Sequence, residues 1–296
     1  MVETLPNVAP EIDTDFDENE RLFHYMTSEG LAGILRSNCL WATHFLALND
    51  SQEFRAARDA MASFVGHRMG ERLAALKVNG RIQPLPDAPP IREVASKQGE
   101  RFVDSLYQSL FAVHQPFVFS GFICNKDDVY AFENGVLQHW GTYGGGGGFA
   151  IQINPHALTE CLRGNEERYV GDLWSTGKVD YSEGAEPPAL HRPFYDELGK
   201  SAQEVIEQSV FRPEEKFDVA KAIGPFIRIA SYSKHHFFKI EQEARLVIMR
   251  LAPSVPQEVH PHEVFVRAAK HDVISYIEVL NGVLLNWPHL GSGLID

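Results

Sequence analysis

The chain has 296 residues, of which 44% are hydrophobic and 23% charged, and its formal net charge is −13. These fractions are typical of a globular protein, and no apolar run reaches the roughly 18–20 residues that a membrane-spanning helix needs. The acidic balance disfavours non-specific binding to nucleic acid, which requires a basic surface.

The amino-terminal segment 1–20 contains acidic residues but no Lys or Arg, and we expect it to be a disordered acidic tail. A single domain over residues 21–296 is expected to follow. No basic leader with an apolar stretch is visible, and the three cysteines are widely spaced and match no zinc or redox pattern. We therefore expect a cytoplasmic protein with reduced thiols and no membrane partner.

The first part of the domain predicts short strands alternating with helices. Strands are expected at 21–25 and 40–43, with a helix between them that is capped by Thr27 or Ser28. The segment Asn49-Asp50-Ser51 is expected to cap a long helix.

The middle of the chain begins with a proline-rich stretch, about residues 79–99, which predicts an exposed loop within the domain. The elements expected after it are a helix over about 93–114, a strand over 116–123, a strand over 149–153 and a helix opened by Asn154-Pro155. The last third predicts a strand near 179–181, a helical block over about 190–235, and strands at 243–250, 263–267 and 273–279. Strands at both ends with helices between them indicate an α+β fold.

Five consecutive glycines, Gly144 to Gly148, do not match a nucleotide-phosphate loop. Such loops follow a strand and open a helix, whereas this run precedes a strand and no lysine follows it. We expect a hinge or tight turn that lets backbone approach a ligand closely. The histidine pairs His235-His236 and His260/His262 lack the helical spacing of zinc ligands, so no metal site is expected.

One strand near the carboxyl end combines an apolar second half with charges in its first half. Glu241, Glu243 and Arg245 stand at alternate positions, which in a strand point to one face. A charged side chain at the end of a buried apolar strand is costly unless it is paired or has a functional role. These residues are therefore candidates for the edge of an active site. The alternative is an exposed Glu–Arg ladder along a strand, which contributes little energy.

Four blocks in fixed order carry a resemblance to a known family. They are Phe23-His24-Tyr25-Met26-Thr27-Ser28; Leu40-Trp41-Ala42-Thr43 followed by Leu48-Asn49-Asp50-Ser51-Gln52-Glu53-Phe54; Phe119-Ser120 and Asn125-Lys126-Asp127 followed by Gln138-His139-Trp140-Gly141-Thr142-Tyr143; and Phe238-Lys239 with Glu241-Gln242-Glu243-Ala244-Arg245. Over roughly residues 21–280 they resemble the bacterial domain of unknown function 2971.

The same layout is similar, more distantly, to the ADP-ribosyltransferase superfamily. That resemblance implies one α+β domain with a split mixed or antiparallel sheet and helical insertions, which uses NAD as substrate without a metal. It implies that Glu243 is the catalytic carboxylate, that Glu241 acts on an acceptor, and that Arg245 keeps the acids ionised. The residues implied to bind the cofactor are His24, Tyr25, Thr27, Ser120, Trp140 and Tyr143. The middle Ser-Thr-Ser motif is absent, and Phe119-Ser120-Gly121 matches it only in part.

These resemblances predict an NAD-dependent ADP-ribosyltransferase or NAD glycohydrolase that acts on a protein or nucleic-acid acceptor, with a toxin or phage-defence role by analogy. Two alternatives stay open at this point. One is a non-catalytic sensor module that binds a nucleotide or nucleic acid. The other is a different nucleotide-processing enzyme on an unrelated α+β fold.

Overall fold

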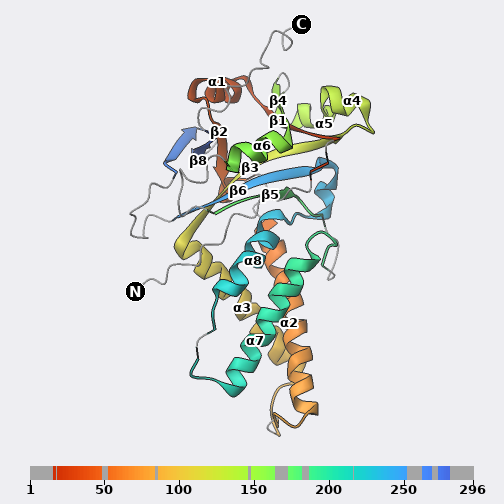
Figure 1. Cartoon of the computed structure of the whole chain (residues 1–296), viewed down its shortest axis with the longest axis vertical. Helices are drawn as coiled ribbons and strands as arrows, with labels where there is room; N and C mark the ends of the chain where they lie inside the picture. Colours follow the sequence, from red (N-terminus) through yellow and green to blue (C-terminus); the bar gives the residue numbers. More distant parts are fainter. Residues whose placement is uncertain are drawn as a thin grey trace. The chain divides into compact units, whose positions relative to one another are not determined.

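A computed structural model describes residues 16–17, 19–48, 53–83, 86–145, 148–163, 173–181, 187–215, 217–251, 262–268 and 273–280. The chain forms two compact units, each built from separate segments (Figure 1). The sheet unit comprises Ala9–Asn49, His114–Val179 and Ile240–Asp296. The helical unit comprises the described residues within Asp50–Val113 and Asp180–Lys239. The long helices pack among themselves in the helical unit, and the single domain expected over residues 21–296 stays a prediction.

An antiparallel sheet forms the centre of the sheet unit. Its eight strands are β1 (Glu20–Met26), β2 (Leu40–His44), β3 (His114–Asn125), β4 (Phe149–Ile153), β5 (Leu173–Lys178), β6 (Glu243–Leu251), β7 (Val264–Ala268) and β8 (Val273–Val279). All strand pairs within it are antiparallel. The predicted α+β class is confirmed, and the sheet is antiparallel rather than mixed.

Strand β3 is the axis on which the sheet is organised, because it pairs with three other strands. Along one edge it pairs with β6 from His114 to Phe122. Along the other edge it pairs first with β2, at Phe117 and Val118, and then with β1, from Phe122 to Asn125. Among the described strands, neither β1 nor β2 pairs with residues 119–121. The sheet therefore splits at this point of β3, where β1 turns to pair with β4 and β2 turns to pair with β8.

The two faces of the sheet carry separate apolar clusters. The larger cluster includes Phe119 and Leu246 of the sheet, and it is covered by Ile34 of α1 (Ser28–Ser37) and Leu158 of α6 (Pro155–Arg163). The smaller cluster contains Phe122 with other apolar side chains of β1 and β3, and it lies under α4 (Val129–Asn134) and α5 (Leu137–Tyr143). Because side chains alternate across a strand, each residue of β1, β3 and β6 belongs to one face or the other.

Local signals explain where the short helices begin and end. The hydroxyl of Thr27 accepts from the N–H of Gly30 and caps α1, which ends at Asn38 in a left-handed conformation with φ of 53°. The carboxamide oxygen of Asn154 accepts from the N–H groups of His156 and Ala157 at the start of α6. Both N-caps were expected, because short polar side chains satisfy the unpaired amides of a first turn.

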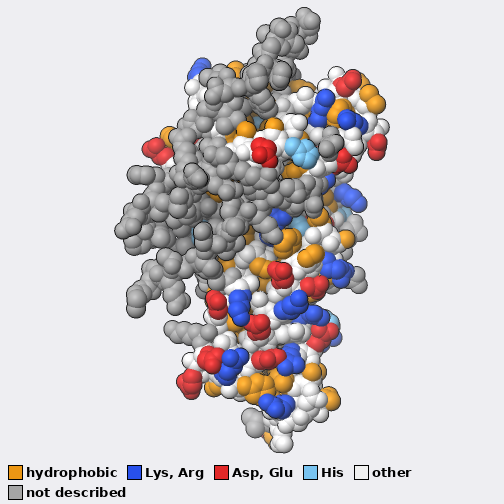
Figure 2. Space-filling view, in the orientation of Figure 1, with side chains coloured by type: hydrophobic (Ala, Val, Ile, Leu, Met, Phe, Trp, Pro, Cys, Tyr) orange, Lys and Arg blue, Asp and Glu red, His pale blue; other side chains and the backbone are white. Residues whose placement is uncertain are grey.

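The helical unit consists of α2 (Glu53–Val78), α3 (Ile91–Val113), α7 (Arg192–Phe211) and α8 (Ala220–Tyr232). Helices α2 and α3 cross where Gly66 faces Gly99, and a Cβ atom on Gly99 would lie 2.6 Å from the backbone nitrogen of Gly66. Figure 2 shows acidic and basic side chains interleaved over the visible face of these helices. Ion pairs such as Arg58–Asp104 join neighbouring helices there. Such exposed pairs contribute little stability, so the helices are held mainly by their apolar contacts.

Three sequence predictions need correction. The proline-rich loop ends at Pro90 rather than at residue 99, because the carbonyl of Pro90 accepts from the N–H groups of Glu93 and Val94 and so begins α3; a proline suits a helix start, where its missing N–H is not needed. The strand expected near 179–181 lies earlier, as β5. The acidic tail ends before residue 20, since Glu20 begins β1 and Phe16 is buried.

Two other expectations lie outside the described residues: the tail over 1–15 and the helix cap at 49–51. Within the part of the chain that the structure describes, none of the helices is long and apolar enough to cross a membrane.

We expect Gly99→Ala to destabilise the helical unit by about 1–3 kcal/mol, because the added methyl group would meet backbone atoms that cannot move without separating α2 and α3. The control is Gly70→Ala in α2, where the new Cβ would be at an ordinary contact distance of 3.4 Å from Ala95. That change should stabilise the helix by up to about 1 kcal/mol. Urea denaturation followed by circular dichroism at the helix band measures both. Equal effects would show that the two helices do not cross at Gly99.

Candidate functional site

Glu243 and Arg245 form a buried ion pair at the start of β6. They stand at positions i and i+2, so their side chains share one face of the strand, as predicted. The Nε of Arg245 donates to Oε1 of Glu243 at 2.8 Å, and its Nη2 donates to Oε2 at 3.0 Å. Each residue is 3% exposed. The alternative of an exposed Glu–Arg ladder is therefore wrong.

The burial of this pair makes it an interdependent unit. Taking two charges out of water is costly, and their attraction offsets that cost only when the geometry is good and further hydrogen bonds are made. The bidentate contact meets the first condition. The register of the sheet meets the second, because it sets Ser120 of β3 directly opposite Arg245.

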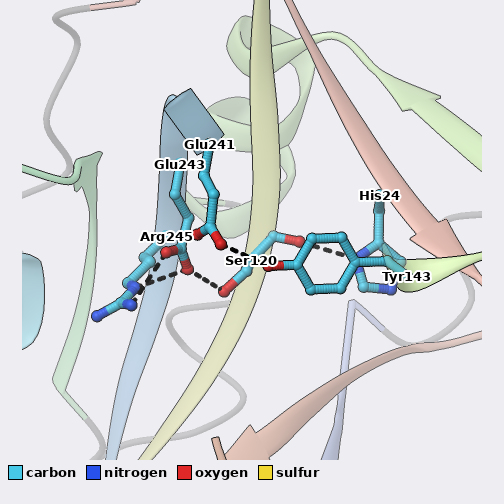
Figure 3. Close-up of polar contacts among 6 residues, drawn as sticks. All are labelled: His24, Ser120, Tyr143, Glu241, Glu243 and Arg245. Atoms are coloured by element: carbon cyan, nitrogen blue, oxygen red, sulfur yellow. Dashed lines mark hydrogen bonds and ion pairs between the residues drawn. The ribbon is translucent and has the colours of Figure 1, made fainter. Parts of the chain in front are cut away.

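Ser120 of β3 contacts both His24 of β1 and Glu243 of β6 (Figure 3). Its hydroxyl donates to Oε1 of Glu243 at 2.5 Å, and its backbone carbonyl accepts from Nδ1 of His24 at 2.7 Å. This carbonyl lies within residues 119–121, with which neither β1 nor β2 pairs. The side chain of His24 therefore supplies the hydrogen bond that the backbone of a neighbouring strand would otherwise make. One residue of the central strand thus links the first strand with β6.

His24 lies on the face opposite to Glu243. It alternates with Leu22 and Met26 of the larger cluster, and its ring is 4.5 Å from that of Phe119. Burial lowers the pKa of His24, the hydrogen bond with Ser120 raises it, and the positive charge of Arg267 lowers it, with a net shift downward. A carbonyl can only accept, so Nδ1 carries the proton of the neutral ring and Nε2 is a hydrogen-bond acceptor.

Glu241 does not belong to the strand, which corrects the expectation that it continues the alternation. It is the last residue of the 3₁₀ helix η3 (His236–Glu241), and Gln242 follows with a left-handed φ of 50°. The backbone stays attached to the sheet, since the N–H of Ile123 donates to the carbonyl of Gln242. Glu241 is 9% exposed, and its Oε1 accepts from the hydroxyl of Tyr143 at 2.7 Å.

Three residues expected to bind the cofactor make contacts within the protein. Thr27 caps α1 as described above. The hydroxyl of Tyr25 accepts from the N–H of Val136, and burial raises the pKa of Tyr25 to about 12. The indole N–H of Trp140 donates to the carbonyl of Asn134, and its ring packs edge-on against Tyr25. These contacts hold α4 and α5 against β1.

His139 is a residue that sequence reasoning missed, although it lies in one of the four motif blocks. It is 2% exposed, and its ring contacts those of Phe122 and Tyr143. Burial lowers the pKa of His139, and the negative charge of Glu241 opposes this. The available signal was its position four residues before Tyr143, which places both side chains on one face of a helix.

The glycine run makes a tight turn between α5 and β4. A Cβ atom on Gly148 would overlap the carbonyl oxygens of Gly144 and Met26, and Gly145 has a positive φ of 65°. The close approach here is between backbone segments, which agrees with the expected turn. Gly146 and Gly147 lie outside the described residues.

Within the described ranges, no group of three or more His, Cys, Asp or Glu side chains is placed to hold a metal ion. Asp128 caps α4 by accepting from the N–H of Ala131. Comparisons with protein-family models, curated proteins and solved structures found no match. The resemblance to the two families therefore stays a prediction that rests on the motif blocks.

We expect Arg245→Met to destabilise the sheet unit by about 3–5 kcal/mol, because it leaves a buried carboxylate without its partner. The double change Glu243→Gln with Arg245→Met should recover part of that loss. All four tryptophans belong to segments of the sheet unit, so urea denaturation followed by tryptophan fluorescence measures it selectively. Removal of an exposed charge by Lys126→Met is the control and should change stability by no more than about 0.5 kcal/mol. An effect of Arg245→Met as small as that would contradict the buried pair.

Acid should destabilise the sheet unit partly through His24. Its pKa is lowered by folding, so below about pH 6.5 the unfolded chain binds a proton that the folded chain does not, and stability falls as pH falls. His24→Asn keeps an N–H donor near the position of Nδ1 but cannot titrate in this range. We expect the variant to lose less unfolding free energy than the wild type between about pH 7 and pH 5. Identical losses would show that His24 is already protonated or exposed.

Proposed function

We propose that this chain is an NAD-dependent ADP-ribosyltransferase or NAD glycohydrolase on an ADP-ribosyltransferase-like fold. The observation that carries the proposal is the double use of Ser120, which holds His24 by its carbonyl and Glu243 by its hydroxyl at the split of the sheet. The resemblance implied that a histidine of the first strand and a glutamate of a late strand act on one substrate. Their link through a single residue supports a common site at this split of the sheet.

The chemistry fits these side-chain types. Breaking the bond between ribose C1′ and the nicotinamide nitrogen sends the electron pair to that nitrogen and leaves positive charge on the ribose, as in glycoside cleavage. A carboxylate that faces the ribose stabilises this charge without forming a bond to it. An acceptor then bonds to C1′ and gives up its proton; with water as acceptor, the reaction is hydrolysis.

The geometry favours different roles for the two carboxylates from those that the sequence suggested. The charge of Glu243 is matched by the bidentate guanidinium of Arg245, so it is poorly suited to stabilise a second cation. The Oε1 of Glu241 accepts from the neutral hydroxyl of Tyr143. Because Glu243 is engaged in its pair with Arg245, we assign the charge-stabilising role to the other carboxylate, Glu241. Glu243, Arg245 and Ser120 form the rigid frame behind it.

His24 contributes an acceptor at Nε2, which suits a ribose hydroxyl. His24 and Glu243 lie on opposite faces of the sheet and are linked at the split of β3, so we propose that the dinucleotide binds beside this split. The net charge of −13 favours a specific acceptor site over broad nucleic-acid binding. By analogy alone, this activity suits a cytoplasmic toxin or phage-defence effector that modifies a protein or nucleic acid.

The test is nicotinamide release from NAD, measured by chromatography with NAD alone and then with added protein, RNA or DNA as acceptors. We expect Glu241→Gln to lower the rate by about two orders of magnitude, the usual effect of removing one electrostatic stabiliser of a transition state. Glu133→Gln, on the exposed surface of α4, is the matched control and should keep the wild-type rate.

Binding is followed in parallel as the rise in melting temperature with NAD. Absence of both nicotinamide release and NAD-induced stabilisation would overturn the proposal. Stabilisation without release under every acceptor would instead favour the sensor module.

A further inference from the structure

His139 is a buried imidazole whose polar atoms have no assigned role. Its residue is 2% exposed, and neither Nδ1 nor Nε2 has a hydrogen-bond partner among the described residues. Leaving a buried polar atom without a partner destabilises the fold. An aromatic or aliphatic side chain would fill this position without that cost, so the imidazole calls for a functional explanation.

The surroundings of His139 are aromatic and bring it close to Glu241. Ring centroids of Phe122, Tyr25 and Tyr143 lie 4.4, 5.4 and 6.0 Å from that of His139. Tyr143, on the same side of α5, donates its hydroxyl to Glu241 at 2.7 Å. The imidazole and the carboxylate are therefore neighbours of one tyrosine.

The titratable groups that surround His139 come from each element packed on α5. Tyr25 of β1 has a pKa raised by burial to about 12, and Cys124 of β3, in the same apolar cluster, has one raised by burial to about 11. Both stay neutral at ordinary pH. Glu241 of η3 is the acidic group whose charge acts on His139, and it opposes the lowering of the His139 pKa by burial.

We propose that His139 is a positioning residue for Glu241: the protonation state of its ring sets the charge that Glu241 presents to the substrate. When His139 is neutral, the carboxylate keeps its negative charge for the ribose cation. When His139 is protonated, the imidazolium beside it cancels that charge. The catalytic consequence rests on the proposed function, whereas the coupling between His139 and Glu241 does not.

The coupling has a definite sign. An opposite charge nearby favours the charged form of a titratable group, so Glu241 holds the His139 pKa higher than burial alone would. Removing that charge by Glu241→Gln must lower it. Acid must also suppress catalysis through His139, which takes up its proton at a lower pH than an exposed imidazole because burial lowers its pKa. Replacing the ring by His139→Phe removes both the titration and the two unsatisfied nitrogens, while preserving an aromatic filling of the cluster.

The deciding experiment is a histidine titration of the full chain by NMR, with the His139 signal identified by its loss in His139→Phe. We expect His139 to titrate at least about half a pH unit lower in Glu241→Gln than in the wild type. Glu133→Gln is the control and should leave it unchanged. Titration at the same pH in all three proteins overturns the inference, whether or not the chain releases nicotinamide.

Where nicotinamide is released, the pH profile adds a second readout. His139→Phe should keep or raise the melting temperature, because it removes unsatisfied buried polar atoms, and it should lose the acid limb below about pH 6.5. An unchanged acid limb shows that His139 only fills the core. If no nicotinamide is released, the proposed function fails and the NMR titration alone decides the inference.

Discussion

The ion pair between Glu243 and Arg245 is buried against β3, the central strand of the sheet. Such a pair is stable there only if neighbouring groups form hydrogen bonds with it. A carboxylate and a guanidinium at 3% exposure require close mutual geometry and further hydrogen bonds. The bidentate contact supplies the geometry, and the hydroxyl of Ser120 supplies a further bond. That requirement ties the register of β6 to β3, because a slip of one residue would turn Ser120 to the other face. The carbonyl of Ser120, and His24 with it, is positioned by the same register.

The polar groups of the site are separated by the sheet into two environments. Glu243, Arg245 and Ser120 Oγ lie on the side of the smaller cluster, near Tyr143 and Glu241. His24 lies on the side of the larger cluster and meets them only through the backbone of β3, where β1 and β2 leave it. This arrangement explains how charged groups and a neutral imidazole coexist in a small volume: the backbone of β3 lies between them. On the side of the smaller cluster, Glu243 accepts from Arg245 and Ser120, and Glu241 accepts from Tyr143.

Much of the sheet could be predicted from local pattern, because apolar runs and turn residues mark strands wherever they pair. The shared face of Glu243 and Arg245 followed from the period of two in a strand. The place of Glu241 did not, since nothing in Glu241-Gln242-Glu243 signals that Gln242 takes a left-handed conformation. The central position of β3 depends on pairings distant in sequence, and so does the burial of His139, which requires α5 to lie on Phe122. The close approach of α2 and α3 at Gly66 and Gly99 is likewise a contact between separate segments, which local pattern does not reveal. The ADP-ribosyltransferase likeness rests on motif residues, with no matching protein to support it.

The order of the chain has a consequence for how the protein is made. One segment of the helical unit immediately precedes β3 in the chain, and the other ends shortly before β6. Ser120 and Glu243, which lie on these two strands, are 123 positions apart. Contacts of such high sequence separation form late, because a long loop must be closed first. During synthesis, β3 leaves the ribosome long before its partner β6 and has an unpaired apolar edge until β6 has been made. A chain that ends before Glu241 would therefore contain His24 and Ser120 but neither glutamate, and the reaction proposed here would begin only after β6 has been synthesised.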